Sequence, residues 1–473
     1  MSDSQMYRFV ADEVARVCEG QVLSGSLGRV FGGLSIDSRK VMKNDLFIAI
    51  RGDRYNGHDF VGEAVQRGAV GVIVSDRAVA SQKSNTSGET VIILVRDTTK
   101  SLQAIARHVR RQSGTKVVAI TGSVGKTTTK ELAASFIGAR HTVVRNVGNL
   151  NNHIGLPLSL LALKNRPEVA VVELGMNHAG EIRQLVGIAE PNVRVWTNVA
   201  EVHAEFFSSK DAIADAKAEI LLGAGKEDHL VVNAGDPFVM SRVGDFPGSI
   251  TTFGVDMQAD VRATAIQDDG VNGVGADVDT PVGRTTFHSQ LIGVGNIANV
   301  VAAISVALRF QVPLDAIREV LERFKPLSRR GSVHRLSGGV TVVDDSYNSN
   351  PEALRLALQS VGASQGYRRR VAVLGEMLEL GEQAFESHRS SGCLAVQAGF
   401  DCVATVGGTD GDALADGALA AGLTDGAVLK FSTSEEATEV LAKFIQPGDL
   451  VLVKGSRGMQ TDLIVDKLRA EWD

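Results

Sequence analysis

The stretch Lys116-Val-Val-Ala-Ile-Thr-Gly-Ser-Val-Gly-Lys-Thr-Thr-Thr129 decides how this 473-residue chain is interpreted. Its first residues, Lys116 to Ile120, form an almost continuous apolar run. Such a run predicts a strand of a parallel sheet that is covered on both faces. A glycine-rich turn follows, and the residues after it predict a helix. A strand, a glycine-rich turn and a helix start together provide the context that a phosphate-binding loop requires.

The residue types in this turn suit a polyphosphate. Glycines let backbone N–H groups point at phosphate oxygens, and a helix N-terminus adds positive potential. Lys126 is expected to reach the β- and γ-phosphates, and the Thr127 hydroxyl is expected to bind Mg²⁺. The general pattern has a glycine six residues before the lysine, where this chain has Ile120, so the motif is a shortened variant. We expect the nucleotide to be held by Gly122, Ser123, Val124, Gly125, Lys126, Thr127 and Thr128.

Three residues beyond the loop are candidates for further chemistry. Glu173 directly follows the apolar run 169–172. Its carboxylate is therefore expected at the carboxyl end of a buried strand, where it can hold Mg²⁺. His203 follows a later strand and Lys217 lies in a helical segment. Taken alone, these two are better interpreted as an ordinary loop histidine and a solvated helical lysine.

The rest of the chain alternates short apolar runs with helical patterns, which predicts an α/β fold. We expect a smaller N-terminal α/β domain at 1–112, a central parallel sheet with flanking helices at 113–327, and a C-terminal α/β domain at 328–473. Residues 258–290 predict a β-rich excursion before a helix that begins near Asn296. The polar stretch 81–89 predicts a loop. The expected strands are 45–50, 70–74, 91–95, 116–120, 169–172, 193–196, 229–232, 340–343, 370–374, 402–406 and 450–453.

Composition excludes several classes of protein. The net charge of −6 gives no global basic field, so neither nucleic acid nor an anionic membrane is an expected partner. Cys18, Cys393 and Cys402 are scattered, and they make neither a disulfide framework nor a zinc site. The N-terminal residues lack the pattern of a signal peptide. No apolar run approaches the ~20 residues that span a bilayer. We therefore expect a cytoplasmic protein that is not inserted in a membrane.

The chain resembles the Mur ligase family over nearly its whole length. Together with the loop, the resemblance is carried by Asp37-Ser-Arg39, Gly57-His-Asp-Phe60, Asn149-Leu-Asn-Asn-His-Ile-Gly-Leu-Pro157, Asp344-Asp-Ser-Tyr-Asn-Ser-Asn-Pro351, Leu374-Gly-Glu-Met-Leu-Glu-Leu-Gly381 and Lys454-Gly-Ser-Arg-Gly458. It implies a UDP-sugar-binding domain at 1–112, an ATP-binding domain at 113–327 and a Rossmann-like ligase domain at 328–473. The stretch 344–351 is the most discriminating, and it implies that D-alanyl-D-alanine is ligated to UDP-N-acetylmuramoyl-tripeptide.

The resemblance also implies roles for individual residues. Lys126, Lys217 and His203 are the implied catalytic residues. The implied cofactors are ATP and two Mg²⁺ ions. Thr127 and Glu173 are the expected protein ligands of one ion. A carbamylated Lys217 and His203 are the implied ligands of the second ion. Carbamylation requires Lys217 to be neutral for part of the time, which burial or nearby cations favour. The implied nucleotide contacts outside the loop are Asn296, Asn299, Arg330 and Asp345, with Tyr347 near the adenosine. The implied substrate contacts are Ser38, Arg39, Asn149, Asn152, Asn348 and Asn350.

One departure affects the adenine side: this chain has Gly293-Val-Gly-Asn296 where the family usually has G-x-H-N.

The implied reaction begins when a substrate carboxylate attacks the γ-phosphate of ATP, which gives an acyl phosphate. The amine of the dipeptide then displaces phosphate, so catalysis is mostly positioning and charge neutralisation. We expect a monomer.

Three alternatives remain open. The first is a sister ligase for a different amino acid, or an enzyme similar to folylpolyglutamate synthase; the stretch 344–351 argues against both. The second is a non-catalytic nucleotide-binding regulator on the same fold. The third is a P-loop motor or GTPase, although no guanine-reading motif is visible.

Overall fold

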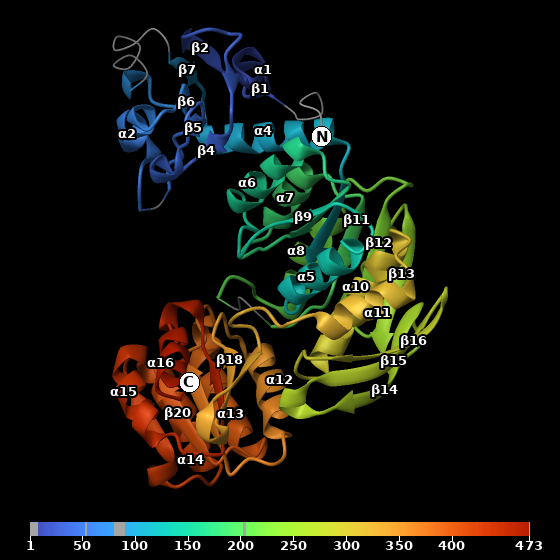
Figure 1. Ribbon diagram of the computed structural model, residues 1–473, viewed down its shortest axis with the longest axis vertical. Helices are drawn as coiled ribbons and strands as arrows, with labels where there is room; N and C mark the ends of the chain where they lie inside the picture. The colour runs from blue at the N-terminus through green and yellow to red at the C-terminus, as the bar shows by residue number, and fades with distance from the viewer. Residues whose placement is uncertain (1–7, 53, 80–89, 202–204, 473) are drawn as a thin grey trace. The chain divides into compact units, whose positions relative to one another are not determined.

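The computed structural model describes residues 8–52, 54–79, 90–201 and 205–472. The chain divides into two compact units (Figure 1). The first unit contains residues 1–119, 141–176 and 181–193, and the second contains 120–140, 177–180 and 194–473. The predicted loop 81–89 lies outside the described residues.

The first unit begins with a five-stranded sheet in the order β2-β7-β6-β5-β4. The strands β4 to β7 are parallel, and β2 pairs with β7 in the antiparallel direction. Apolar side chains of β5, β6 and α2 form the core of this region. The elements are β1 (Phe9–Val10), α1 (Ala11–Val17), β2 (Gln21–Ser24), β3 (Val30–Phe31), β4 (Leu34–Ser35), β5 (Leu46–Ile48), α2 (Val61–Gln66), β6 (Gly71–Val74), β7 (Val91–Leu94) and α4 (Thr98–Ser113).

The first unit continues with strands in the order β8-β10-β9. Asp97 caps the long helix α4 by accepting hydrogen bonds from the N–H groups of Thr99 and Lys100. Gly114, with φ 71°, ends this helix in the left-handed conformation. The elements are β8 (Lys116–Thr121), β9 (Val143–Arg145), α6 (Gly155–Leu160), β10 (Val169–Glu173) and α7 (Glu181–Ala189).

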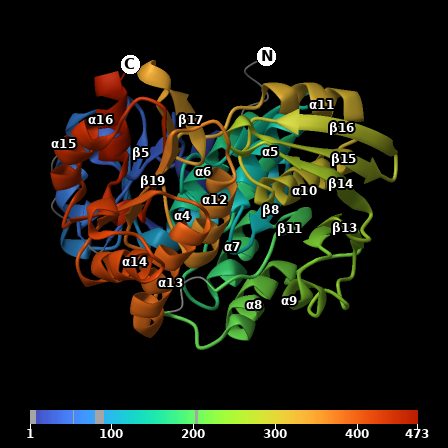
Figure 2. The ribbon, with the colours of Figure 1, turned by 90° about the horizontal axis from the view of Figure 1, so that it is seen from below.

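The second unit contains the end of β8, the glycine-rich turn and α5, followed by strands in the order β16-β15-β14-β13-β12-β11. The β-rich excursion predicted for 258–290 is confirmed as β14, β15 and β16, which pair in the antiparallel direction. Figure 2 shows α8 and α9 side by side below this sheet. The elements are α5 (Lys126–Ile137), β11 (Val193–Trp196), α8 (Lys210–Ala218), β12 (His229–Asn233), α9 (Pro237–Met240), β13 (Ser249–Val255), β14 (Val261–Asp268), β15 (Val274–Thr280), β16 (Gly283–Ser289), α10 (Gly295–Arg309) and α11 (Leu314–Arg323).

The C-terminal part of the second unit is a six-stranded sheet in the order β17-β18-β22-β19-β20-β21. Only β17 is antiparallel to its neighbour in this order. The elements are β17 (Ser332–Arg335), β18 (Thr341–Asp345), α12 (Pro351–Gly362), β19 (Arg369–Gly375), α13 (Ala384–Gln397), β20 (Cys402–Val406), α14 (Thr409–Ala420), β21 (Val428–Phe431), α15 (Ser434–Phe444), β22 (Asp449–Lys454) and α16 (Asp462–Trp472).

Alternation along β19 explains why this sheet is covered on both faces. Ala372 and Leu374 belong to one core with α12, α13 and α14, and Val371 and Val373 belong to another with α15 and α16. Successive strand residues point to opposite faces, so an apolar run supplies both cores. Figure 1 shows the helices on the two sides of these strands.

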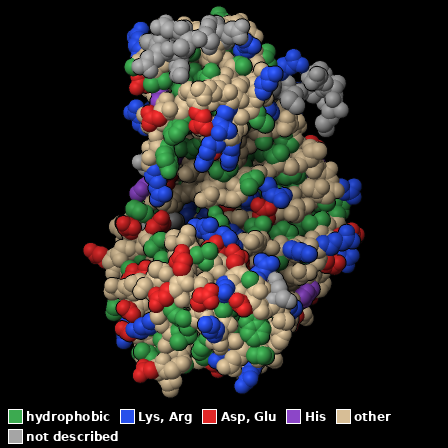
Figure 3. Space-filling view, turned by 60° about the vertical axis from the view of Figure 1, so that its left-hand side comes forward, with side chains coloured by type: hydrophobic (Ala, Val, Ile, Leu, Met, Phe, Trp, Pro, Cys, Tyr) green, Lys and Arg blue, Asp and Glu red, His purple; other side chains and the backbone are tan. Residues whose placement is uncertain are grey.

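The predicted α/β class is confirmed, and most predicted strands are found within one or two residues of their expected bounds. The strands β1, β2, β3, β4, β9, β13, β17 and β21 were not predicted. Apart from β13, each has at most four residues, and β13 is exposed at its start. Acidic and basic side chains are interspersed on the face drawn in Figure 3. In the part of the chain that the structure describes, no helix combines the length and the hydropathy needed to cross a bilayer.

Candidate active site

The glycine-rich turn between β8 and α5 accepts only glycine at two positions. Gly122 has φ 151°, and a Cβ there would lie 1.9 Å from Thr197 Oγ1. Gly125 has φ 82° and is the N-cap of α5, and a Cβ there would lie 2.1 Å from Asn299 Oδ1. The turn can therefore keep this conformation only if these positions have no side chain. Since Gly125 has no side chain to cap α5, a ligand can approach the start of the helix closely.

Lys126 and Lys217 share a partner in this turn. Lys126 Nζ donates to the Gly122 carbonyl at 2.8 Å and to the Ser123 carbonyl at 3.0 Å. Lys217 Nζ, which α8 supplies, donates to the same Gly122 carbonyl at 3.0 Å. Two residues that are 91 positions apart in the sequence thus bring two amino groups to one oxygen. The structure brings these two predicted site residues together.

Lys217 is buried, with 2 % of its surface exposed. Burial, and after it the charge of nearby Lys126, lowers the pKa of Lys217 well below its ordinary value of 10.5. A lysine with a lowered pKa carries a neutral, nucleophilic amine for more of the time. The interpretation of Lys217 as a solvated helical lysine is therefore wrong.

Asn198 and Thr197 hold the turn in place, and sequence reasoning did not assign them a role. Asn198 Oδ1 accepts from the N–H groups of Ser123 and Val124 at 3.1 and 2.9 Å. Thr197 Oγ1 donates to the Val124 carbonyl at 2.9 Å. Two of the N–H groups expected to hold phosphate are thus bound to a side chain here. The available signal was that both residues directly follow strand β11.

The Ser123 hydroxyl of the loop is also buried and hydrogen-bonded. Ser123 Oγ donates to the Ala200 carbonyl at 3.1 Å and accepts from the Ala200 N–H at 2.8 Å. Thr127 is buried at the start of α5, and Thr128 is partly buried beside it. The loop is thus bonded to the segment after β11 through side chains and backbone.

Asn296 and Asn299 lie one turn apart on α10, where the sequence predicted nucleotide contacts. Asn299 is buried and accepts from Thr129 Oγ1 of α5 at 3.2 Å. Its amide nitrogen donates to Asn296 Oδ1 at 2.9 Å, and Asn296 donates to the Ile292 carbonyl at 2.8 Å. Asn299 therefore connects α10 to the helix that follows the phosphate loop.

The predicted residues of the C-terminal part form contacts among themselves. The Arg330 guanidinium lies over the Tyr347 ring, 4.1 Å from its centre, which is a cation–π contact. Asp345 pairs with Lys454 Nζ at 2.6 Å, and the same nitrogen donates to the Asn348 carbonyl at 3.0 Å. Asn350 caps α12 by accepting from the Ala353 N–H at 2.9 Å.

The remaining predicted residues belong to the first unit. Glu173 is buried at the end of β10, and its carboxylate accepts from Asn151 Nδ2 at 2.8 Å. Asn152 Oδ1 accepts from the Gly155 N–H at the start of α6 at 2.8 Å, and Asn149 is exposed shortly before it. The Ser38 hydroxyl donates to Glu63 at 2.8 Å, and Arg39 is exposed and pairs with Asp37 at 2.9 Å.

His203 lies outside the described residues. Within the described ranges, no three His, Cys, Asp or Glu side chains converge on a site that could hold a metal ion. Mg²⁺ commonly binds to one or two carboxylates together with substrate phosphates and water. The buried Glu173 carboxylate and the Thr127 hydroxyl are hard oxygen donors of the type that such binding uses.

Three family models match the chain. The Mur ligase family catalytic domain matches residues 30–110, the Mur ligase middle domain matches 120–307, and the Mur ligase glutamate ligase domain matches 329–457. The UDP-N-acetylmuramoyl-tripeptide–D-alanyl-D-alanine ligase of Bacillus subtilis is 33% identical over 93% of this chain and 93% of its own length. The chain belongs to the Mur ligase family.

Solved structures of this family have the same fold. MurF from Acinetobacter baumannii matches with a TM-score of 0.87 at 29% identity, over 98% of this chain and 100% of the other. MurF ligase from Thermotoga maritima in complex with ADP matches with a TM-score of 0.80 at 27% identity, over 93% and 97%. The resemblance of this chain to the Mur ligases is therefore confirmed in both sequence and structure.

Proposed function

We propose that this Mur ligase catalyses the ATP-dependent ligation of D-alanyl-D-alanine to UDP-N-acetylmuramoyl-tripeptide, a step of peptidoglycan precursor synthesis. The observation that carries the proposal is the pair of amino groups, Lys126 and Lys217, on the Gly122 carbonyl. A nucleotide-binding regulator needs the first of these for phosphate but has no use for a buried lysine with a lowered pKa. The relative in Bacillus subtilis supports the choice of substrates, and the ADP complex of the Thermotoga maritima ligase supports the nucleotide.

The loop residues act by positioning and by neutralising charge. Lys126 is proposed to leave the Gly122 and Ser123 carbonyls and to contact the β- and γ-phosphates, where it offsets charge that repels the attacking carboxylate. The start of α5 adds N–H groups and positive potential at the same place. The carboxylate of the tripeptide attacks the γ-phosphorus and ADP leaves. The amine of D-alanyl-D-alanine then attacks the acyl carbon and inorganic phosphate leaves.

Mg²⁺, when bound, would polarise the phosphate oxygens and reduce their negative charge. Thr127 and Glu173 are the proposed protein ligands of one ion, and His203 and a carbamylated Lys217 of a second. Lys217 suits this role because its lowered pKa favours the neutral amine that reacts with carbon dioxide. The carbamate would replace a buried cation by an oxygen donor.

The domain roles are part of the proposal. Residues 1–112 would bind the UDP-sugar, 113–327 would bind ATP, and 328–473 would bring Arg330, Asp345, Asn348 and Asn350 to the reactants. Ser38, Arg39, Asn149 and Asn152 would contact the UDP-linked substrate, and Asn296 and Asn299 the adenine side. We propose a monomeric, cytoplasmic enzyme.

The decisive experiment measures phosphate release from ATP with UDP-N-acetylmuramoyl-tripeptide, in the presence and absence of D-alanyl-D-alanine. The proposal expects release only when both substrates are present, and a product that is heavier by the dipeptide. Release that requires a different amino acid would move the enzyme to a sister activity. Absence of release with any acceptor would favour the regulator.

A matched pair of variants connects this activity to the loop. Lys126→Met should reduce turnover by about 1,000-fold or more, because one phosphate-binding cation is lost. Lys430→Met removes an exposed lysine that pairs with Asp412 and Asp416, and it should retain wild-type turnover. Wild-type turnover in Lys126→Met would contradict the proposed mechanism.

A further inference from the structure

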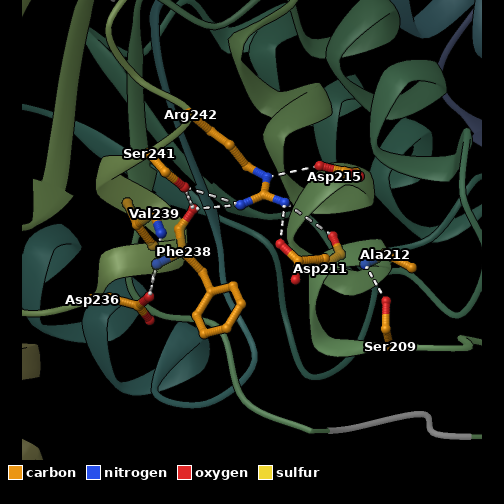
Figure 4. Close-up of polar contacts among 9 residues, drawn as sticks. All are labelled: Ser209, Asp211, Ala212, Asp215, Asp236, Phe238, Val239, Ser241 and Arg242. Carbon is orange, nitrogen blue, oxygen red and sulfur yellow. Dashed lines mark hydrogen bonds and ion pairs between the residues drawn. The ribbon is translucent and has the colours of Figure 1, made fainter.

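Helix α8, which supplies Lys217, is held on its outer face by one arginine. Arg242 is the second residue after α9 and is mostly buried, with 17 % of its side chain exposed. Its guanidinium contacts Asp215 at 2.7 Å and Asp211 at 2.9 Å, and it also donates to the Asp211 carbonyl at 3.3 Å. Figure 4 shows the guanidinium between these two carboxylates of α8 and the end of α9.

The same guanidinium is anchored at the α9 side. It donates to the Phe238 carbonyl at 3.1 Å and to Ser241 Oγ at 3.1 Å. A second contact joins the two helices, since Lys210 Nζ lies 4.6 Å from the centre of the Phe238 ring. The planar guanidinium with several donors thus bridges two helices.

The geometry of α8 makes this contact relevant to Lys217. Asp211 and Asp215 are four residues apart and lie on one helix face. Lys217 is two residues beyond Asp215, so it points to nearly the opposite face. That face carries the buried Nζ that donates to Gly122 O at 3.0 Å. A rotation or shift of α8 would therefore move the Lys217 amine relative to the phosphate loop.

The other end of α9 is bonded to the segment that holds the loop. Asp236 caps α9 and accepts from the Val199 N–H at 2.6 Å. Ala200, the next residue, exchanges two hydrogen bonds with Ser123 of the loop. The contacts therefore form a closed ring: loop, Ala200, Val199, Asp236, α9, Arg242, α8, Lys217, and back to the loop at Gly122.

We propose that Arg242 is a positioning residue that fixes α8 through Asp211 and Asp215 and thereby holds Lys217 at the Gly122 carbonyl. This inference rests on the proposed function. The two aspartates are 70% and 71% exposed, and such exposed ion pairs contribute little to global stability. The contribution of Arg242 is therefore to geometry, and a small displacement of a catalytic group is costly in rate.

The chain offers a matched control. Arg284 also bridges two aspartates, Asp277 at 2.6 Å and Asp279 at 3.7 Å, but on β15 and β16. Arg284→Gln thus removes a similar pair of ion contacts on elements that do not carry Lys217. Turnover of Arg284→Gln is expected to stay within about twofold of wild type, since surface pairs of this kind act locally.

The test compares Arg242→Gln, Arg242→Lys and Arg284→Gln by steady-state kinetics and by hydrogen exchange of the full-length chain. Arg242→Gln should lower kcat about 10-fold, with KM for ATP changed by less than about threefold, because the loop itself is intact. Amides of α8 should exchange faster in Arg242→Gln, while amides of α12 should not change. Arg242→Lys should recover part of kcat, because one cation can pair with one aspartate at a time.

The Asp211→Asn/Asp215→Asn double variant provides an independent check. It should match Arg242→Gln, and adding Arg242→Gln to it should lower kcat little further, since all three side chains act as one unit.

Two results would overturn the inference: a kcat of Arg242→Gln equal to that of Arg284→Gln, or unchanged exchange of α8. The failure of the proposed function is a different result, in which wild-type enzyme releases no phosphate with the two substrates. Exchange of α8 would still test the coupling of Arg242 to this helix in that case.

Discussion

Two buried lysines of this enzyme, one at the end of strand β22 and one in helix α8, differ in what faces the amino group. Lys454 ends β22 with 3 % of its surface exposed, and its Nζ lies 2.6 Å from the Asp345 carboxylate. Lys217 is 2 % exposed, and its Nζ faces the Gly122 carbonyl and the charge of Lys126. Burial is thus nearly equal, and the electrostatic surroundings are opposite.

The difference separates a structural lysine from a reactive one. A buried cation beside a carboxylate is compensated, so Lys454 can hold β18 and β22 together as a permanent ion pair. A buried cation beside a second cation is not compensated, so the neutral form of Lys217 is favoured. Burial alone therefore does not identify a catalytic lysine, and the sign of its nearest charge is more informative.

The largest expected effect that tests this comparison is on turnover. Lys217→Ala and Lys217→Arg should each lower kcat about 1,000-fold, because neither side chain can become a carbamate that binds metal. A short carboxylic acid such as acetate should partly restore Lys217→Ala, which leaves space for it, and should not restore Lys217→Arg. High bicarbonate should restore neither variant. A fully active Lys217→Arg enzyme would show that a plain cation suffices.

The next effect is on the stability of the C-terminal part. Lys454→Met leaves Asp345 without its cation, and we expect a loss of about 2 kcal/mol in the free energy of unfolding. This is less than for a fully buried pair, because Asp345 keeps 23 % of its side chain exposed. Denaturant titration measures the loss. The double variant Lys454→Met/Asp345→Asn should recover more than half of it, and simple additivity would contradict the ion-pair account.

The contrast between these lysines also marks how far the sequence could be interpreted. The phosphate loop was predicted because Gly122, Gly125 and Lys126 are neighbours in the chain, and a local motif needs no knowledge of the fold. Lys217 could not be distinguished from a solvated lysine by its helical pattern. Its buried amino group donates to the glycine-rich turn, which is 95 positions away in the sequence at Gly122. Contacts of this separation are set by the packing of strands and helices.

Asn198 and Arg242 illustrate the same limit. Asn198 lies five residues before the predicted site residue His203, but its bonds to the loop depend on how close β11 and the turn lie in the fold. Arg242 and its partners Asp211 and Asp215 look like ordinary surface charges in the sequence. The substrate contacts predicted in the first unit and the metal role of His203 stay predictions.

Replacing Lys217 is expected to increase stability, whereas replacing Lys454 is expected to reduce it, and the increase should be the smaller of the two effects. Lys217→Met replaces an uncompensated buried amine by an apolar side chain of similar length, so it should raise the free energy of unfolding by about 1 kcal/mol near pH 7. Unfolding in denaturant, in buffer free of carbon dioxide, measures it. Lower stability of Lys217→Met would indicate that the hydrogen bond to Gly122 outweighs the cost of burial.

The higher free energy of unfolding expected for Lys217→Met depends on pH, and the direction of this dependence follows from the lowered pKa of Lys217. The folded pKa of Lys217 is lowered, so between that pKa and 10.5 the unfolded chain binds more protons than the folded chain. Stability of the wild-type protein therefore rises with pH in this window, while Lys217→Met lacks this contribution. The advantage of the variant is complete below the folded pKa and should disappear as the pH approaches 10.5. A constant advantage would contradict a lowered pKa.

The smallest expected effect distinguishes the two causes of the lowered pKa of Lys217, which are burial and the charge of Lys126. Lys126→Met removes the neighbouring cation but leaves Lys217 buried, and burial is the larger cause. The folded pKa of Lys217 should therefore rise only in part, and the pH window in which stability increases should become narrower without closing. The measurement compares Lys126→Met with Lys126→Met/Lys217→Met in denaturant between about pH 7 and pH 10.5. If the two variants showed the same pH dependence, the charge of Lys126 would be the main cause, and the reactivity of Lys217 would depend on the lysine that also binds phosphate. If the pH dependence of the two variants still differs, burial in the fold keeps the pKa of Lys217 low without the charge of Lys126. Lys217 would then stay reactive when a nucleotide draws Lys126 away from the Gly122 carbonyl.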